Sequence, residues 1–257
     1  MKIAVFDSGF GSISIIREIQ KKKIFKGELI YFADQKNFPY GVKSKKELEA
    51  IIKDTVDLLE EKFSPDFIIM ASNTPTLLLD FSRISSKIVG VYPPLNDAAK
   101  ISRTRNVAIL GTKTIIQSEN ITKFIENCKV SNDIVVHKID CSLLVELVES
   151  GKFLTDKEYC KNIIKEVLED VFLDNSIDVA TLSSTHLPFL ESFLRLIFKN
   201  VKFLDPAENV ANDVKDLIGD NDLQQNVLRI FTSGDVNLFK KNLQMMGIDN
   251  EVSFLTT

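Results

Sequence analysis

Short apolar segments alternate along the chain with longer amphipathic segments, and this alternation constrains the fold most strongly. The apolar segments are rich in β-branched residues, as buried strands are. They are 2–6, 28–33, 66–71, 87–92, 106–110, 133–139, 178–182, 201–204 and 228–231. Helical spacing is clearest between them at 44–63, 156–173 and 235–246. Strands that alternate with helices predict an α/β fold with parallel sheets and flanking helices.

Two of the apolar segments end in nearly the same way. In "IIMASNTPT" the apolar residues are followed by Ser72, Asn73 and Thr74. In "VATLSSTHLPFL" they are followed by a serine pair that ends in Ser184, and then by Thr185 and His186. In open α/β sheets, ligands bind outside the carboxyl ends of the strands, which makes these polar residues candidates for a binding site. A separation of 112 positions is too long for a solenoid repeat. The separation is instead consistent with the two motifs ending equivalent strands in two similar lobes that face one cleft.

A glycine-containing turn, "FDSGFGSIS" (6–14), follows the first apolar segment. It partly resembles a dinucleotide fingerprint, but Ser14 stands at the third glycine position and Asp7 precedes the glycines. A plain turn between strand and helix is a second interpretation. The third, which we favour, is a helix N-terminus that holds a ligand carboxylate together with Ser8, with Asp7 as a site acid or base.

The loop "NFPYGVKS" (37–44) contains Tyr40 and Gly41 before a helical segment. Proline, tyrosine and glycine in this order fit either ordinary turn chemistry or a loop that contacts a ligand. The residues alone leave both interpretations open.

The charge balance argues against nucleic acid as a partner. The chain has 32 Lys and Arg against 36 Asp and Glu and a net charge of −4, without the basic surface that such binding needs. Its apolar segments fall short of the ~20 residues that span a bilayer, and Asp7 interrupts the first one, unlike in a signal peptide. We expect a cytoplasmic protein that does not bind membranes.

Cysteine and histidine are sparse. Three separated cysteines and two histidines predict neither a disulfide framework nor a metal site. The interrupted glycine pattern and the lack of another cofactor motif predict that no nicotinamide, pyridoxal phosphate or metal is required. Ser184 next to His186 suggests a serine nucleophile, but the G-x-S-x-G turn of such enzymes is missing.

Taken together, the motifs resemble those of the glutamate racemases, which belong to the cofactor-independent aspartate/glutamate racemase superfamily. The motifs that carry the resemblance, in order, are "IAVFDSGFGS", "IYFADQKNFPYGVKS", "IIMASNTPT", "LSSTHLPFL" and "FTSGDVNLF". The resemblance extends from Lys2 to about Gly247. It implies an isomerase linked to D-glutamate and peptidoglycan, and often a homodimer. It also implies two α/β lobes facing across a cleft, residues 1–95 plus 207–257 and the inserted residues 96–206.

The family's chemistry explains the doubled motif. Racemisation removes the α-proton on one face of the amino acid and returns a proton on the other, so it needs a base on each side. The family uses two cysteines, and here Ser72 and Ser184 occupy their positions. Because a serine hydroxyl is a far weaker acid than a thiol, we expect the chain to bind a ligand and to racemise it poorly or not at all.

The resemblance assigns roles to the other matching positions. Asp7 matches an acid that assists one catalytic side, and His186 and Glu149 match polar residues that assist the other. The positions that match ligand contacts are Ser8, Tyr40, Gly41, Asn73, Thr74 and Thr185. Tyr40 and Gly41 correspond to the loop at the ligand's carboxylate.

Further departures from the family bear on the ligand. Ile115 stands where the family usually has a ligand-binding threonine, Glu146 replaces a usual proline, and "VYPPLND" lacks a Glu-Pro pair. Aspartate or another small dicarboxylate therefore remains an alternative to glutamate, and a catalytically silent sensor remains an alternative to a racemase. The departures favour natural divergence, whereas the symmetric serines also fit an active racemase altered at both bases.

Overall fold

The computed structural model describes residues 1–85, 87–219 and 226–256. The chain divides into two compact units, the first formed by residues 1–91 and 207–257 and the second by residues 92–206. The chain thus leaves the first unit once and returns to it once. The division into a first lobe of residues 1–95 plus 207–257 and an inserted second lobe of residues 96–206 stays a prediction.

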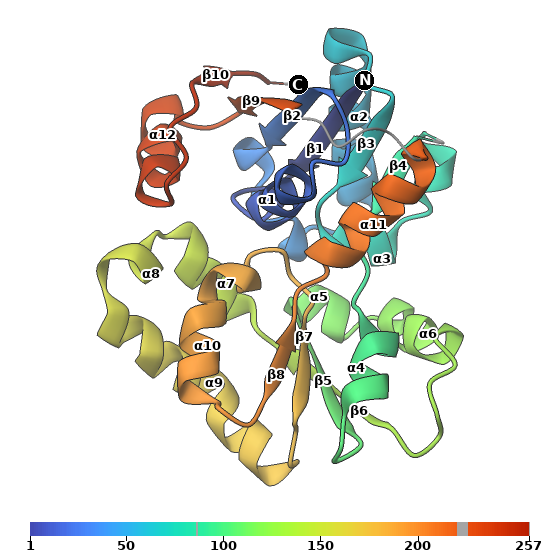
Figure 1. Cartoon of the computed structure of the whole chain (residues 1–257), viewed down its shortest axis with the longest axis vertical. Coiled ribbons are helices and arrows are strands. Elements are labelled where there is room, and N and C mark those ends of the chain that lie inside the picture. Colours follow the sequence, from blue (N-terminus) through green and yellow to red (C-terminus); the bar gives the residue numbers. More distant parts are fainter. Residues whose placement is uncertain (86, 220–225, 257) are drawn as a thin grey trace. The chain divides into compact units, whose positions relative to one another are not determined.

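The first unit contains a fully parallel sheet. In the described residues its six strands have the order β10-β9-β2-β1-β3-β4 (Figure 1). Their bounds are β1 Lys2–Asp7, β2 Gly27–Ala33, β3 Phe67–Met70, β4 Ile88–Gly90, β9 Asn226–Thr232 and β10 Val252–Phe254. The central strand β1 is apolar and fully buried from Ile3 to Phe6, as a strand covered on both faces must be.

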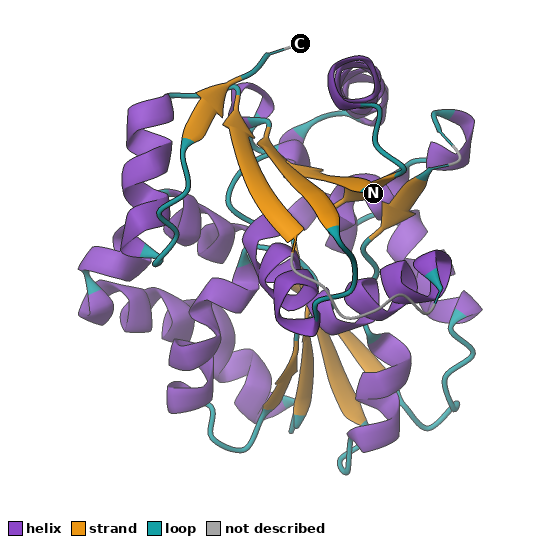
Figure 2. Ribbon diagram, turned by 45° about the horizontal axis from the view of Figure 1, so that its top comes forward, coloured by secondary structure: helices purple, strands orange, loops and turns teal. Residues whose placement is uncertain are grey.

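Helices flank this sheet, and α1 and α11 lie side by side (Figures 1 and 2). The helices are α1 Ser12–Lys22, α2 Lys45–Phe63, α3 Asn73–Leu78, α11 Ala207–Ile218 and α12 Val236–Met245, with 3₁₀ turns η1 Gln35–Asn37, η2 Tyr40–Val42 and η3 Phe81–Arg83. In α2, the buried Leu48, Ile52, Val56 and Leu59 recur at three- and four-residue spacing and cover the sheet.

The second unit contains a smaller parallel sheet. Its four described strands have the order β6-β5-β7-β8, with bounds β5 Asn106–Gly111, β6 Val135–Asp140, β7 Val179–Leu182 and β8 Lys202–Leu204. The helices are α4 Leu95–Ile101, α5 Lys113–Ile116, α6 Glu119–Asn127, α7 Ser142–Glu149, α8 Lys152–Thr155, α9 Lys157–Asp174 and α10 Glu191–Ile197, and η4 Leu187–Leu190 is a 3₁₀ turn.

The two sheets repeat one arrangement of strands. The order β2-β1-β3-β4 in the first unit matches β6-β5-β7-β8 in the second. The hydrogen bonds beyond the strand ends match as well, since Ala71 N donates to Phe6 O at 2.8 Å and Ser183 N donates to Leu110 O at 2.9 Å. Ser72 and Ser184 each follow one of these residues, so they occupy equivalent positions in the two units.

The parallel α/β fold predicted from sequence is confirmed. Each of the apolar segments expected to form strands overlaps a strand, and all strand pairs are parallel. Among the helices that the structure describes, none is both long and apolar enough to cross a membrane.

Candidate active site

Ser72 lies where the chain passes from β3 into α3. It is the N-terminal cap residue of α3, but its side chain does not cap the helix. The next residue, Asn73, is buried, and its Nδ2 donates to Val91 O at 2.9 Å, which ties the start of α3 to the end of β4. Asn73 Oδ1 and its neighbour Thr74 are also buried, and within the described residues this oxygen has no hydrogen-bond partner.

Asp7 and Ser8 lie at the carboxyl end of β1 and are both buried. The Asp7 carboxylate accepts a hydrogen bond from Gly9 N at 2.7 Å, and Gly9 O accepts one from the Tyr31 hydroxyl at 2.5 Å. The turn before α1 is therefore fixed on both sides. The Gly9 amide, one of the donors that a nucleotide phosphate would need, is already used by Asp7.

Tyr40 opens the 3₁₀ turn η2 and is buried, with Gly41 partly exposed beside it. The Tyr40 hydroxyl donates to Asp34 Oδ2 at 2.9 Å. Burial, followed by the negative charges of Asp34 and Asp7, holds the pKa of Tyr40 well above its usual value. The phenol therefore stays protonated and acts as a donor, not as a base.

Ser184 lies in the second unit, beyond the carboxyl end of β7. It is buried together with Ser183, Thr185 and His186. The hydroxyls of Thr181 and Ser183 lie 2.7 Å apart, and Ser184 O accepts from Leu187 N at 3.0 Å. The strand end and the following turn are thus fixed by local hydrogen bonds.

His186, two residues after Ser184, forms a nearly buried pair with Glu149. His186 Nε2 lies 2.6 Å from Glu149 Oε1, and their side chains are 7% and 10% exposed. Glu149 comes from the last turn of α7, so the pair joins two segments far apart in sequence. A carboxylate at this distance orients the imidazole ring.

The two serines lack an activating partner. Neither hydroxyl makes a side-chain hydrogen bond to any residue described in the structure. The cysteines do not supply a thiolate instead. Cys141 is fully buried, and burial followed by the charge of Asp140 raises the pKa of its thiol far above the usual value. Burial also raises the pKa of Cys160, to about 11.

Most of the predicted site residues therefore follow strands of their own units, whereas Glu149 lies in the last turn of α7. Asp7, Ser8, Tyr40, Gly41, Ser72, Asn73 and Thr74 follow β1, β2 and β3 in the first unit, and Glu149, Ser184, Thr185 and His186 lie in the second. Sequence reasoning missed Asp34, a fully buried carboxylate within one of the quoted motifs. Its signal was an acidic residue directly after the buried stretch Leu29–Ala33.

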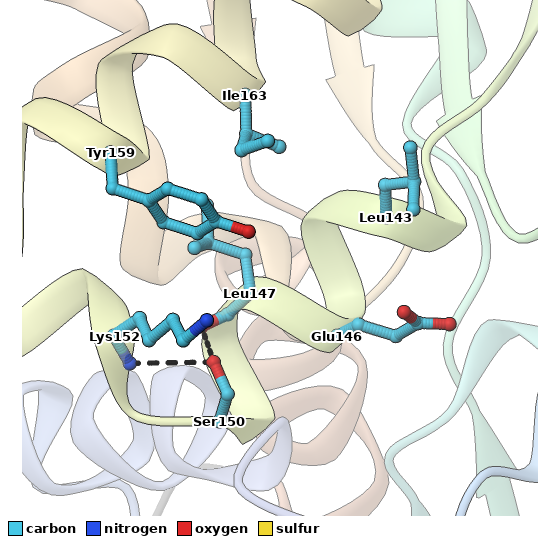
Figure 3. Close-up of a pocket in the computed structure, with 7 residues that line it drawn as sticks. All are labelled: Leu143, Glu146, Leu147, Ser150, Lys152, Tyr159 and Ile163. Atoms are coloured by element: carbon cyan, nitrogen blue, oxygen red, sulfur yellow. Dashed lines mark hydrogen bonds between the residues drawn. The ribbon is translucent and has the colours of Figure 1, made fainter.

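A separate cavity of about 180 Å³ lies in the second unit between α7 and α9 (Figure 3). At the edge of this cavity, Lys152 Nζ lies 4.6 Å from the centroid of the Tyr159 ring. Its lining consists of Leu143, Glu146, Leu147, Ser150, Lys152, Tyr159 and Ile163. This cavity contains none of the predicted site residues. Within the described chain, no cluster of three or more His, Cys, Asp or Glu side chains suits a metal ion.

Comparison with known proteins shows similarity along the whole chain. The chain is 31% identical over 252 residues to the glutamate racemase of Actinobacillus pleuropneumoniae serotype 3, covering 95% of this chain and 93% of that protein. No protein-family model matches the chain.

Two solved structures share the fold. A glutamate racemase isoform from Bacillus anthracis superposes with a TM-score of 0.86 at 25% identity, over 99% of this chain and 97% of the other. The Escherichia coli glutamate racemase, in complex with L-glutamate and the activator UDP-MurNAc-Ala, superposes with a TM-score of 0.84 at 22% identity, over 99% and 98%.

Proposed function

This chain belongs to the glutamate racemase family, and from that premise we propose that it binds glutamate and is strongly impaired in interconverting the L and D forms. The proposal rests on one observation: Ser72 and Ser184 occupy equivalent positions beyond β3 and β7 of two repeated sheets. A two-base racemase needs a proton-transfer group on each face of the α-carbon. The repeat supplies two such positions, and serine fills both.

Each proposed contact follows from the chemistry of the ligand. Tyr40 and Gly41 hold a carboxylate of glutamate, while Ser8, Asn73, Thr74 and Thr185 bind its polar groups. Asp7 assists proton transfer on one catalytic side, and Glu149 and His186 assist it on the Ser184 side. The buried Asn73 Oδ1, which lacks a hydrogen-bond partner among the described residues, supports a role as acceptor for the ligand's amino group.

The expected impairment comes from acidity. A free thiol has a pKa of about 8.5, and a polar site lowers it enough to give thiolate near neutral pH. A serine hydroxyl needs a strong neighbouring base to do the same, and none bonds to Ser72 or Ser184 in the described residues. Binding of glutamate uses the other side chains and should therefore survive better than turnover.

The test follows α-proton exchange and optical rotation in deuterated water, starting from each enantiomer of glutamate. We expect the Ser72→Cys/Ser184→Cys form to racemise at least about 10³-fold faster than the unmodified chain, which corresponds to roughly 4 kcal/mol of transition-state stabilisation. Binding of glutamate is measured in parallel by calorimetry. Fast inversion by the unmodified chain would contradict the proposal, because a serine or another residue would then be transferring the proton.

A second candidate function is a catalytically silent sensor of glutamate or a related dicarboxylate. The hydrogen bonds favour it, since neither hydroxyl bonds to an activating base within the described residues. A sensor would bind ligand tightly and gain little racemase activity when both cysteines are introduced. The two functions are thus separated by the double-cysteine form.

We further propose that the protein is a cytoplasmic homodimer, as the family resemblance implies. Light scattering after size-exclusion chromatography measures the mass in solution directly. A mass near the 29.0 kDa of one chain at micromolar concentration would exclude a stable dimer.

A further inference from the structure

Asp34 is a buried carboxylate at the carboxyl end of β2. It has no exposed surface, and none of the described residues forms an ion pair with it. Three side chains donate hydrogen bonds to it: Asn37 Nδ2 at 2.8 and 3.1 Å, the Tyr40 hydroxyl at 2.9 Å, and the Ser233 hydroxyl at 3.1 Å. A buried charge is costly unless several hydrogen bonds stabilise it, so each of these donors matters to the fold of the site.

The donors come from separate parts of the chain. Asn37 lies in η1, Tyr40 opens η2, and Ser233 follows β9, almost 200 residues later. Asp34 also joins β1, because its own N–H donates to Asp7 O at 2.8 Å. Asp34 therefore connects the loop that carries Tyr40 and Gly41 to the segment after β9 through its carboxylate, and to the end of β1 through its backbone N–H.

The loop after β9 is held closely against the loop after β2. The Ser233 hydroxyl accepts from Lys36 N at 3.0 Å, and Ser233 N donates to Ala33 O at 3.0 Å. A Cβ on Gly234 would lie 2.9 Å from Gln35 Cβ, an atom fixed to the backbone, so a side chain there would disturb the contact between the two loops. The contact between them is thus built into the fold on both sides of Asp34.

The Tyr40 hydroxyl has one proton to donate, and Asp34 receives it. A ligand carboxylate beside this loop must therefore find other donors, and four of the loop's N–H groups, those of Asn37, Phe38, Val42 and Lys43, already donate to backbone oxygens. Donors that the loop presents act only if it holds its conformation before the ligand arrives, because ordering it on binding would reduce the affinity. The Tyr40 side chain then serves to fix the loop through Asp34.

We propose that Asp34 is a positioning residue. It fastens the Tyr40–Gly41 loop to the ends of β1 and β9 and so keeps the loop in the conformation that receives the ligand's carboxylate. This inference rests on the proposed function for the ligand that the loop binds. The position of the loop itself is a property of the ligand-free protein and can be measured without the ligand.

The experiment compares the full-length chain with its Asp34→Asn and Tyr40→Phe forms. Hydrogen–deuterium exchange of the ligand-free protein over residues 36–43 should become at least about tenfold faster in each variant, as expected when a hydrogen bond to a charged group is lost. The dissociation constant for glutamate, measured by calorimetry, should rise by roughly tenfold. The effects of the two changes should be less than additive in the double variant, because both act on the hydrogen bond between Tyr40 and Asp34.

Asp178→Asn is the matched control. The Asp178 carboxylate also accepts several hydrogen bonds, from the Ser102 hydroxyl at 2.6 Å, Arg103 N at 2.7 Å and the Thr104 hydroxyl at 3.0 Å, but it precedes β7 and lies outside the proposed site. We expect this variant to lose stability without changing exchange over residues 36–43 or the affinity for glutamate. A purely structural role for Asp34 would give the same pattern as this control.

Unchanged exchange over residues 36–43 in a folded Asp34→Asn protein would overturn the proposal. If that variant does not fold, Tyr40→Phe and Ser233→Ala each remove one bond to Asp34 and carry the same test. If the unmodified chain does not bind glutamate, the proposed function fails, while the exchange measurement still decides whether Asp34 holds the loop.

Discussion

We propose that at Ser72 and Ser184 a hydroxyl oxygen stands where two-base racemisation needs a group that ionises near neutral pH. Exchange of sulfur for oxygen keeps the size and hydrogen-bonding capacity of the side chain almost unchanged. It changes the fraction of the anion by orders of magnitude, because the hydroxyl is the weaker acid. The same residues can therefore bind a ligand without transferring its α-proton.

Restoring one thiol at a time should separate proton removal from inversion. We expect Ser72→Cys and Ser184→Cys each to exchange the α-proton of one enantiomer of glutamate much faster than that of the other, with little net racemisation. The physical reason is that each enantiomer presents its α-proton to a different base. Proton NMR in deuterated water measures the exchange and polarimetry the inversion, and equal exchange of both enantiomers by one variant would contradict the assignment of one base to each face.

The Glu149–His186 pair should contribute to stability as well as to the site. Glu149→Ala leaves a nearly buried imidazole without its 2.6 Å partner, and we expect the free energy of unfolding to fall by about 2–3 kcal/mol. Glu146→Ala, an exposed position on the same helix, serves as the control and should stay within about 0.5 kcal/mol. Urea unfolding followed by circular dichroism gives both values, and equal effects would mean that the pair adds nothing.

At the scale of elements, the sequence predicts what hydrophobic periodicity encodes. The long buried strands and the helices α2, α9 and α12 all lie within a residue or two of the expected bounds. Strand β10 was missed, because two of its three residues are exposed and the run is too short to show a period. Helix α3 was missed because its Pro75 and threonines give no amphipathic pattern, and tertiary packing buries all six of its residues.

The candidate site was predictable in its residue types but not in its supports. Asp7, Tyr40 and the two serines stand out because polar residues directly after apolar strands are informative. The role of Asp34 depends on Ser233, which β9 brings to it from the far end of the sequence. No local pattern encodes such a contact, and only the order of strands in the sheet creates it.

Helix α2 begins with a capping box directly after the Tyr40 loop. The Ser44 hydroxyl accepts from Glu47 N at 3.3 Å, and Ser44 N donates to the Glu47 carboxylate at 2.9 Å. We expect Ser44→Ala to lower the free energy of unfolding by about 1 kcal/mol at pH 7. Lys45→Ala, on the exposed next residue, is the control and should leave it nearly unchanged.

The capping box should also depend on pH. The hydrogen bonds from the Ser44 hydroxyl and amide lower the pKa of Glu47. A carboxyl whose pKa is lowered by folding stabilises the protein above its unfolded pKa, about 4.3 for glutamate, and loses that contribution as pH falls through the folded pKa. The difference between the unmodified chain and Ser44→Ala should therefore shrink below about pH 4, and a constant difference would show that Glu47 has no part in it.

Across the whole molecule, one backbone arrangement carries two different sets of side chains. Asp34 N donates to Asp7 O in the first unit, and at the equivalent place Cys141 N donates to Gly111 O in the second. A buried carboxylate therefore has a buried thiol as its counterpart. The first unit supplies carboxylates at its strand ends and the second an imidazole–carboxylate pair, so the repeat is one of topology and not of chemistry.

Alkaline pH should destabilise the whole protein through its buried thiols. Burial raises the pKa of Cys160 from its usual value near 9 to about 11. Between these values the thiol ionises in the unfolded chain and stays protonated in the folded one, so stability is fully present below pH 9 and falls as pH rises towards 11. In Cys160→Ala the fall should be shallower, as measured by urea unfolding at a series of pH values. A parallel curve would show that this thiol titrates alike in both states.

The route of the chain between the two units has a consequence for biosynthesis. The first unit is interrupted at Val91 and resumes at Ala207, and its strand β2 pairs with β9, whose first residue is Asn226. A ribosome releases the chain from the N-terminus onwards, so the uninterrupted second unit is complete before β9 has been translated. Until then the nascent first unit exposes an open edge along β2, and this edge closes only when residues 226–232 have left the exit tunnel. Because synthesis runs from the N-terminus, β2 is made early but gains its neighbour β9 late.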